Sequence, residues 1–225
     1  MKYYYIVAAA GVGKRMQLDY PKQFLEYNGK PIFIKTLETI SKNRLVTDII
    51  IVTNKDYIEK VKEYVKDFNI EKVKDIIQGG KERQDSVYNA LEIINDEDAI
   101  VAVQDGVRPF IKEEYIEKAY KELEKNMDIS GVVIGVMVKD TIKVVDENGI
   151  IIQTPNRSSL VAAQTPQVFR LQTLKKAYKK AKEEGYLGTD DSSLVEIIGE
   201  KVKILEGDYD NIKITTKEDL IYLEK

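Results

Sequence analysis

Cysteine and histidine are both absent from this chain of 225 residues. Without cysteine the chain has no disulfide, no thiolate nucleophile and no cysteine-ligated zinc site. Without histidine it can contain neither a Ser-His-Asp triad nor a histidine base, and a histidine-ligated metal is equally excluded. The chemistry must therefore come from carboxylates, lysine, arginine, hydroxyls, backbone amides and hard cations such as Mg²⁺.

Long hydrophobic runs and an excess of positive charge are also absent. No apolar stretch approaches the roughly 20 residues that a membrane-spanning helix needs. The formal net charge of -3 disfavours a general nucleic-acid binder, because displacing counterions requires excess cations. The short N-terminal apolar run resembles a first core strand more than a signal peptide, so we expect a cytoplasmic location.

Apolar segments of strand length alternate with segments of helical spacing along most of the chain. Strands are expected at 3–9, 48–53, 73–78, 99–104, 130–136 and 202–206, and helices at 32–42, 56–68, 83–94, 112–126, 171–184 and 191–198. The capping-box spacing of Thr215–Glu218 predicts one more helix at the end. This order predicts an α/β fold with a mostly parallel sheet and helices on both faces. Ligands of such sheets bind at the carboxyl ends of the strands.

Residues 138–163 interrupt this alternation. Segments 139–145 and 149–153 resemble two short strands joined by the turn-forming sequence Asp-Glu-Asn-Gly. Because an isolated hairpin is only marginally stable in water, we expect this arm to pack on a second subunit. The sequence therefore predicts a single domain, residues 1–225, with 138–163 as an inserted β-arm for dimerisation.

The most informative segment follows the first strand and reads AAAGVGKRMQLDYPKQ, residues 8–23. Small residues allow a backbone to approach a phosphate closely, and the cations Arg15 and Lys22 would neutralise polyphosphate charge. The segment is not a dinucleotide fingerprint, because Met16 stands where the last glycine of that motif is required. It is not a Walker A loop either, because Ala8 stands where the first glycine of that loop is required. An ordinary turn with surface cations is the alternative interpretation.

A second segment, GGKERQDS at residues 79–86, follows the third predicted strand. Its glycine pair would let backbone groups line up against a flat ligand such as a base, and Ser86 or the first amides of a helix could bind that ligand. A plain strand break with Asp85 as the helix cap explains this segment equally well on its own.

A third segment, QDGVRP at residues 104–109, ends the fourth predicted strand. Asp105 at a strand end is suited to bind Mg²⁺ or a hydroxyl, and Arg108 is suited to bind a phosphate. A buried pair between Asp105 and Arg108 is the alternative. Lys213, in the strand-like segment 210–215, is one more cation that indicates little by itself.

The chain resembles the 2-C-methyl-D-erythritol 4-phosphate cytidylyltransferase family of the non-mevalonate isoprenoid pathway over essentially its whole length. Seven segments carry the resemblance in order: AAAGVGKRM…PKQF, GGKERQDSV, QDGVRPF, KDTIK, QTPQVF, TDDSSLVE and DNIKIT. The resemblance implies a Rossmann-like nucleotidyltransferase fold with a projecting, dimerising β-arm. It also implies a reaction in which CTP and 2-C-methyl-D-erythritol 4-phosphate give 4-diphosphocytidyl-2-C-methyl-D-erythritol and pyrophosphate, with Mg²⁺ as cofactor.

The resemblance further implies roles for individual residues. Arg15 and Lys22 would stabilise charge on the α-phosphate of CTP as the substrate phosphate attacks in line. CTP would be bound by Ala8, Ala9, Ala10, Gly11, Gly13, Gly80, Ser86 and Thr165. The methylerythritol phosphate would be bound by Asp105, Arg108, Thr141, Arg157, Thr189 and Lys213, with Asp105 also organising Mg²⁺. Thr141 and Arg157 fall on the arm, so they would serve the neighbouring subunit.

The chain departs from the family pattern at three positions, where Gln104 replaces the usual His, Val107 an Ala and Lys81 a common acidic residue. The nearest alternative is a ribitol 5-phosphate cytidylyltransferase, although DSV, DTIK and TDDSSLVE favour the methylerythritol enzyme. A non-catalytic nucleotide-binding protein and an NAD-dependent oxidoreductase are alternatives of other classes. The expected partners are CTP, a sugar-alcohol phosphate and a second copy of the chain, without nucleic acid or membrane.

Overall fold

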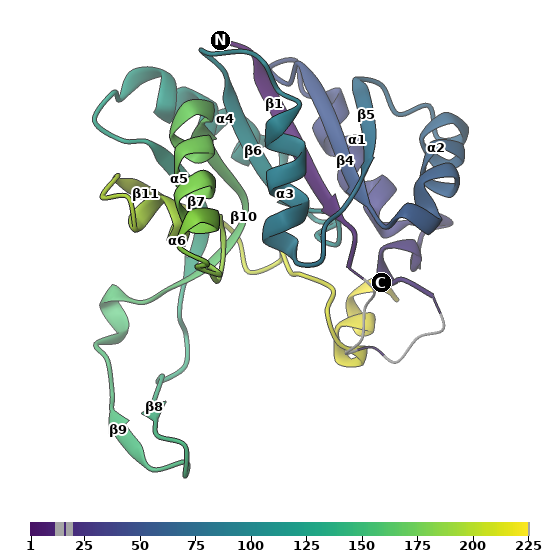
Figure 1. Cartoon of the computed structure of the whole chain (residues 1–225). Coiled ribbons are helices and arrows are strands. Elements are labelled where there is room, and N and C mark those ends of the chain that lie inside the picture. Colours follow the sequence, from purple (N-terminus) through teal and green to yellow (C-terminus); the bar gives the residue numbers. More distant parts are fainter. Residues whose placement is uncertain (12–15, 17–19, 225) are drawn as a thin grey trace.

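A central sheet organises the computed structural model, which describes residues 1–11, 16 and 20–224 (Figure 1). The described residues form seven strands in the order β11-β7-β10-β6-β1-β4-β5. Neighbouring strands run parallel except around β10, which lies antiparallel between β6 and β7. The strands are β1 (Tyr3–Ala9), β4 (Asp48–Thr53), β5 (Val73–Gln78), β6 (Ile100–Asp105), β7 (Gly131–Met137), β10 (Val161–Arg170) and β11 (Val202–Glu206).

Helices cover both faces of this sheet, because its strands are apolar on both sides. The two cores are built by alternation along β1, where Tyr3 and Tyr5 enter one core while Tyr4 and Ile6 enter the other. One face packs against α1 (Ile32–Lys42), α2 (Ile58–Asp67) and α4 (Glu113–Lys125), and the other against α3 (Arg83–Glu92), α5 (Leu171–Glu183) and α6 (Asp191–Glu196). The predicted mostly parallel sheet with helices on both faces is confirmed.

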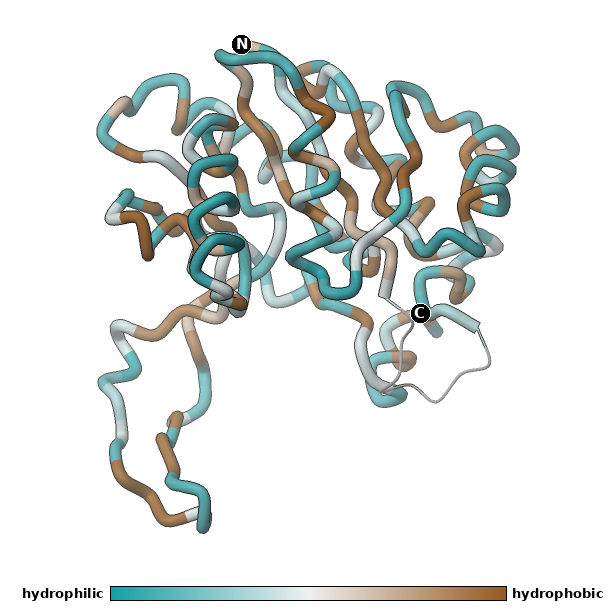
Figure 2. Tube along the Cα trace, in the orientation of Figure 1, coloured by the Kyte–Doolittle hydropathy of each residue, from teal (hydrophilic) through white to brown (hydrophobic). Residues whose placement is uncertain are grey.

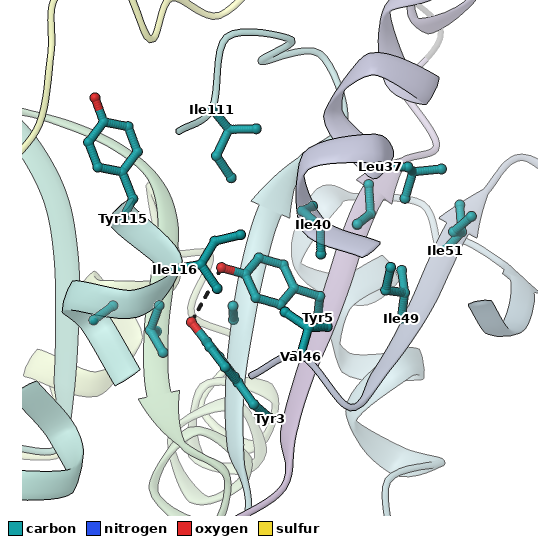
Figure 3. Packing of buried hydrophobic residues seen from close by; sticks show 14 of the residues in the cluster. Tyr3, Tyr5, Leu37, Ile40, Val46, Ile49, Ile51, Ile111, Tyr115 and Ile116 are labelled. Atoms are coloured by element: carbon teal, nitrogen blue, oxygen red, sulfur yellow. Dashed lines mark hydrogen bonds between the residues drawn. The ribbon is translucent and has the colours of Figure 1, made fainter. Parts of the chain in front are cut away.

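The central strands are mainly hydrophobic along their length, whereas much of the helices' length is hydrophilic (Figure 2). Among the buried tyrosines of the core under α1 and α4, Tyr3 and Tyr5 have hydroxyls that lie 3.3 Å apart and hydrogen bond to each other (Figure 3). This pair satisfies two hydroxyls that would otherwise be buried without partners. It lies near the amino end of β1, opposite the end where ligands of such sheets bind.

Two local predictions were wrong. β10 was not predicted, because the polar residues Gln164–Gln167 interrupt its apolar pattern. The final helix is a 3₁₀ helix, η5 (Lys217–Leu223), whose capping box joins Thr216 to Asp219 rather than Thr215 to Glu218. The carboxylate of Asp219 accepts from the backbone N–H groups of both Thr215 and Thr216, which moves the start by one residue. The smaller elements are η2 (Lys22–Phe24), β2 (Glu26–Tyr27), β3 (Lys30–Pro31), η3 (Lys55–Tyr57) and η4 (Arg157–Ser159).

An arm projects from the domain between β7 and β10 (Figure 1). The segments that enter and leave the arm lie side by side at its base, since Met137 pairs with Val161. The far part of the arm contains the short antiparallel strands β8 (Val144–Val145) and β9 (Ile151–Gln153). Large apolar side chains on the arm face solvent, with Ile150 63% and Ile152 65% exposed. Within the described residues, no helix has the length and apolarity needed to cross a membrane.

Candidate active site

A cavity of about 460 Å³ opens at the carboxyl ends of β1, β5 and β6. Its walls come from segments that are far apart in the sequence, as expected for the ligand edge of a parallel sheet. The lining residues are Ala8, Ala9, Ala10, Gly11, Lys22, Gln23, Gly80, Lys81, Glu82, Arg83, Ser86, Asp105, Val107, Lys213 and Thr215. Nine of these lining residues were predicted from the sequence to bind CTP, to bind the acceptor or to act in catalysis.

Lys22 and Gln23 fix one side of this cavity. Lys22 is only 9% exposed, and its Nζ donates a 2.9 Å hydrogen bond to the carbonyl of Ile214. The Gln23 amide donates a 2.6 Å hydrogen bond to the carbonyl of Ala9 at the end of β1. Lys22 therefore holds a fixed, largely buried ammonium at the cavity wall, where it can contact a bound phosphate.

The turn after β5 forms the opposite wall. The Ser86 hydroxyl accepts a 3.0 Å hydrogen bond from the N–H of Gly80 and donates one of 3.0 Å to the carbonyl of Glu82. A Cβ atom on Gly80 would lie 2.2 Å from Cβ of Asp85, so this close turn requires glycine. Glu82 caps α3 and Asp85 is the third residue of the helix, closing a capping box. The alternative with Asp85 as the cap residue itself was therefore wrong.

Asp105 ends β6 at the floor of the cavity and is 6% exposed. Among the described residues three cations surround its carboxylate: Nε of Arg83 lies 3.4 Å from Oδ1, while Nζ of Lys213 and Nε of Arg108 lie 2.9 and 3.5 Å from Oδ2. Burial alone would raise the pKa of Asp105, but these cations outweigh it and hold that pKa well below its usual range. The carboxylate is therefore anionic at neutral pH.

A bulge in β10 brings Thr165 to the same place. The pairing of β10 with β7 shifts between Ala163 and Gln167, and a bulge of this kind turns side chains away from the regular pleat. The Thr165 hydroxyl accepts a 3.1 Å hydrogen bond from the N–H of Asp105. Asn211 donates to the carbonyl of Thr165 at 3.0 Å, which joins the C-terminal segment to the cavity floor.

Unsatisfied polar atoms gather around this floor. Among the described residues, three buried side-chain atoms have no hydrogen-bond partner: Oε1 of Gln104, Oδ1 of Asn211 and Nε of Arg108, whose contact with Asp105 is an ion pair at 3.5 Å. Arg108 Nη1 does donate to the carbonyl of Asn211 at 2.6 Å, and Gln104 Nε2 to that of Asp105 at 3.1 Å. Buried polar atoms are nearly always paired, so their concentration at one place is typical of a functional site.

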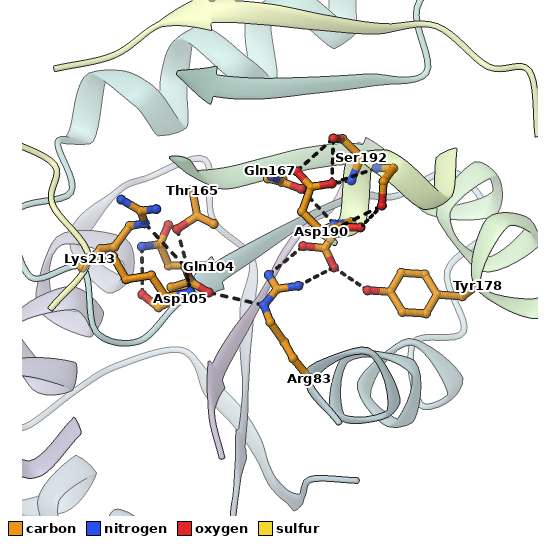
Figure 4. A network of polar contacts seen from close by, with 12 residues as sticks. Arg83, Gln104, Asp105, Thr165, Gln167, Tyr178, Asp190, Ser192 and Lys213 are labelled. Carbon is orange, nitrogen blue, oxygen red and sulfur yellow. Dashed lines mark hydrogen bonds and ion pairs between the residues drawn. The ribbon is translucent and has the colours of Figure 1, made fainter. Parts of the chain in front are cut away.

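Arg83, Asp191 and Tyr178 form a polar network that was not predicted from the sequence; Figure 4 labels Arg83 and Tyr178 within it. The guanidinium of Arg83 donates through Nη1 and Nη2 to the two carboxylate oxygens of the fully buried Asp191, at 3.1 and 2.7 Å. The Tyr178 hydroxyl also donates to Asp191. The signal was present in the sequence, since Arg83 lies inside GGKERQDS and Asp191 inside TDDSSLVE, but only their neighbours were interpreted.

The remaining predicted residues lie elsewhere. Thr189 lines a separate cavity of about 130 Å³ beside Arg83 and Tyr178. Thr141 and Arg157 are exposed on the arm, where Arg157 donates a 2.8 Å hydrogen bond to the carbonyl of Lys139. Neither lines the cavity of its own chain. The predictions for Gly13 and Arg15 fall outside the described residues.

A divalent cation would find few protein ligands in this cavity. The described part of the chain contains no group of three or more acidic side chains arranged to hold a metal ion. The carboxylates of the cavity wall are those of Asp105 and Glu82. Mg²⁺ commonly keeps several waters and binds one or two carboxylates together with substrate phosphates, so one oxygen of Asp105 fits a magnesium that is held mainly by a triphosphate.

Comparisons with known proteins agree on one family. A family model described as 2-C-methyl-D-erythritol 4-phosphate cytidylyltransferase matches residues 3–225. The curated protein of that name from Fusobacterium nucleatum is 52% identical over 221 residues, covering 98% of this chain and 94% of the relative. The one from Clostridium perfringens strain SM101 is 48% identical over 222 residues, covering 97% and 96%.

Solved structures give the same result. The 4-diphosphocytidyl-2C-methyl-D-erythritol synthase of Anaerococcus prevotii matches with a TM-score of 0.86 and 32% identity, over 99% of this chain and 94% of that one. The 2-C-methyl-D-erythritol 4-phosphate cytidylyltransferase of Francisella tularensis matches with a TM-score of 0.84 and 32% identity, over 100% and 99%.

Proposed function

The chain belongs to the 2-C-methyl-D-erythritol 4-phosphate cytidylyltransferase family, and we propose that the cavity at the carboxyl end of its sheet performs that family's reaction. The enzyme is a nucleotidyltransferase that joins CTP and 2-C-methyl-D-erythritol 4-phosphate into 4-diphosphocytidyl-2-C-methyl-D-erythritol and releases pyrophosphate. An oxygen of the acceptor phosphate attacks the α-phosphorus of CTP. The bond from that phosphorus to the bridging oxygen of the β-phosphate breaks, and pyrophosphate leaves with the electron pair. A phosphate monoester is already nucleophilic near neutral pH, so positioning and charge stabilisation suffice.

The observation that supports this role best is the set of cations around one cavity. Lys22 lies on one wall, Arg83 and Lys213 line the cavity, and Arg108 is buried beside Asp105. Joining two phosphorylated substrates concentrates negative charge at the reacting phosphorus, and fixed cations stabilise that charge without reorganisation. We assign Lys22, together with Arg15, to the α-phosphate.

The nucleotide and the acceptor occupy different parts of the cavity in this proposal. CTP lies along the small residues that begin at Ala8, near the end of β1, with its base toward Gly80 and Ser86 and with Thr165 nearby. The acceptor lies over Asp105, whose carboxylate is suited to accept hydrogen bonds from hydroxyls. Lys213 and Arg108, which pair with Asp105 in the structure, are close enough to the same place to bind the acceptor phosphate. Thr189 lines the neighbouring cavity, which shares Arg83 with this one, and would contact the acceptor from there.

Magnesium accompanies CTP in this proposal. When bound it would neutralise phosphate charge and orient the triphosphate. Asp105 would supply one oxygen ligand, and the phosphates and waters would supply the rest. Activity that survives complete removal of divalent cations would contradict this assignment.

The arm supports a homodimer. Its strands are two and three residues long, and its isoleucines are exposed, so a second subunit would cover a surface that is otherwise costly. Thr141 and Arg157 would then reach the neighbour's cavity. Sedimentation at micromolar concentration tests this: the wild type should be dimeric, and a variant with Ile150→Lys and Ile152→Lys should be monomeric and less active. A monomeric, fully active wild type would contradict the proposal.

Pyrophosphate release is the direct test of the activity. The enzyme with Mg²⁺ and CTP should release pyrophosphate on addition of 2-C-methyl-D-erythritol 4-phosphate and not without an acceptor. Higher kcat/KM with ribitol 5-phosphate would favour the sister activity, and binding of CTP without turnover on any sugar-alcohol phosphate would favour a non-catalytic nucleotide-binding protein. We further propose that the enzyme works in the cytoplasm, where nucleoside triphosphates are abundant, which cell fractionation would test.

A further inference from the structure

Arg83 lies between two carboxylates of different surroundings. On one side its Nη1 and Nη2 reach both oxygens of Asp191, which is 0% exposed. On the other side its Nε lies 3.4 Å from Oδ1 of Asp105 at the cavity floor. Arg83 is the first residue of α3 and Asp191 the first of α6, so the network joins two helices to the end of β6.

The Asp191 end of this network is rigidly held. Asp191 accepts the Tyr178 hydroxyl from α5, and its own backbone N–H donates a 3.1 Å hydrogen bond to Oε1 of Gln167 on β10. A two-pronged pair between a guanidinium and a carboxylate fixes the plane of the guanidinium as well as its position. The direction of the Arg83 Nε–H bond is therefore set by Asp191 and Tyr178, which do not line the main cavity.

The other cations of Asp105 are held differently. Lys213 and Arg108 both approach Oδ2, and both are assigned above to the acceptor phosphate. Arg108 is also anchored, because its Nη1 donates to the carbonyl of Asn211, whereas the side chain of Lys213 is 37% exposed. When Lys213 turns to that phosphate, Arg83 stays beside Asp105, because Asp191 holds its guanidinium.

We propose that Arg83 is a positioning residue for the acceptor, which holds the Asp105 carboxylate in the orientation that receives the acceptor hydroxyls. Asp191 and Tyr178 act through Arg83 in the same way. This inference rests on the proposed function, because it concerns how well the acceptor is held in that reaction. CTP binding should depend on the network less than acceptor binding does, because in this proposal Asp105 meets CTP only as one ligand of its Mg²⁺, whereas it binds the acceptor hydroxyls directly.

The sharpest test compares two buried tyrosines. Tyr178→Phe removes the hydroxyl that donates to Asp191, and Tyr3→Phe removes an equally buried hydroxyl that pairs with Tyr5 at the other end of the sheet. Steady-state rates of pyrophosphate release give kcat and both KM values, and calorimetry without acceptor gives the CTP affinity. We expect Tyr178→Phe to lower kcat/KM for the acceptor roughly threefold, because only part of the free energy of a hydrogen bond to a charged group would be felt at the acceptor. Tyr3→Phe should leave this kcat/KM unchanged.

Two further variants act closer to Asp105. Asp191→Asn should raise the acceptor KM and lower acceptor kcat/KM roughly 10- to 100-fold, the usual range for a group that orients a functional side chain, with a much smaller effect on CTP affinity. Arg83→Lys keeps the charge but cannot hold two carboxylates at once, so its acceptor kcat/KM should lie between those of the wild type and Arg83→Gln. Should Arg83→Gln not fold, Tyr178→Phe and Asp191→Asn still decide the matter.

The outcomes separate this inference from the proposed function. A wild type without turnover on the acceptor would remove the proposed function itself. An active wild type whose Tyr178→Phe and Asp191→Asn variants keep normal acceptor kinetics would overturn the positioning role. The same follows if these variants weaken CTP and the acceptor equally, in step with their loss of thermal stability. Full activity of Arg83→Lys would show that charge alone suffices, and would also overturn it.

Discussion

Replacing Lys22 by methionine tests the proposed chemistry most directly. The side chain is 9% exposed, so methionine keeps most of the packing of the lysine stem and removes only the ammonium. The carbonyl of Ile214 loses its 2.9 Å hydrogen bond, which costs about 1–3 kcal/mol of folding free energy. A domain with the usual 5–15 kcal/mol of stability, roughly, remains folded after such a loss.

The effect on turnover should be far larger than the effect on folding. Removing one fixed charge from the reacting phosphate typically costs about 3–4 kcal/mol of transition-state stabilisation, or roughly 10²–10³ in kcat. Lys175→Met is the matched control, because Nζ of Lys175 also donates to a backbone carbonyl, that of Ile94 at 2.6 Å. That contact lies at the end of α3 away from the cavity. Pyrophosphate release by both variants, with melting curves, separates the two effects. A Lys22→Met enzyme with at least a third of the control's rate, roughly, would refute the assignment.

Three further results are expected. Gly80→Ala should weaken CTP binding at least about tenfold, because a 2.2 Å approach to Cβ of Asp85 forces the turn to move; calorimetry with CTP checks this, and unchanged affinity would exclude the turn from the site. The free energy of unfolding, from urea titrations, should be flat from about pH 5.5 to 9, since the chain has no histidine. Hydrogen bonds from Lys112 and Tyr115 lower the pKa of Asp208, so the stability that this carboxylate contributes is lost only as pH falls below about 4. Burial raises the pKa of Tyr5, so its contribution is lost only as pH rises above about 10. A step near pH 6.5 would contradict this. Chelation with EDTA should abolish pyrophosphate release, and excess Mg²⁺ should restore it.

The carboxyl edge of the sheet could be predicted because the relevant signals are local. A buried strand followed by small residues, or by an acidic residue, marks the end of a parallel strand, and the ends of such strands meet at one edge. Ala8 and Asp105 were found in this way, and they lie in register in the structure on neighbouring strands β1 and β6.

The network of Arg83 could not be predicted in the same way, because its partners are 22 and 108 residues away in the chain. No periodicity links α3 to α6, and only the packing of both helices on one face of the sheet brings them together. β10 was missed for a related reason. Its middle residues are polar because Thr165 turns toward Asp105, so the functional site itself removed the apolar pattern that marks a strand.

The pairing of β7 with β10 has a mechanical consequence. The two strands pair from Gly131 and Phe169 in the core to Met137 and Val161 at the base of the arm, and their register shifts once, at the bulge between Ala163 and Gln167. Thr165 lies within that bulge and contacts the backbone of Asp105. β10 therefore connects the base of the arm to the residue that contacts the backbone of Asp105, without any intervening loop. We therefore expect a second subunit bound to the arm to restrict the motion of β10 where it contacts Asp105.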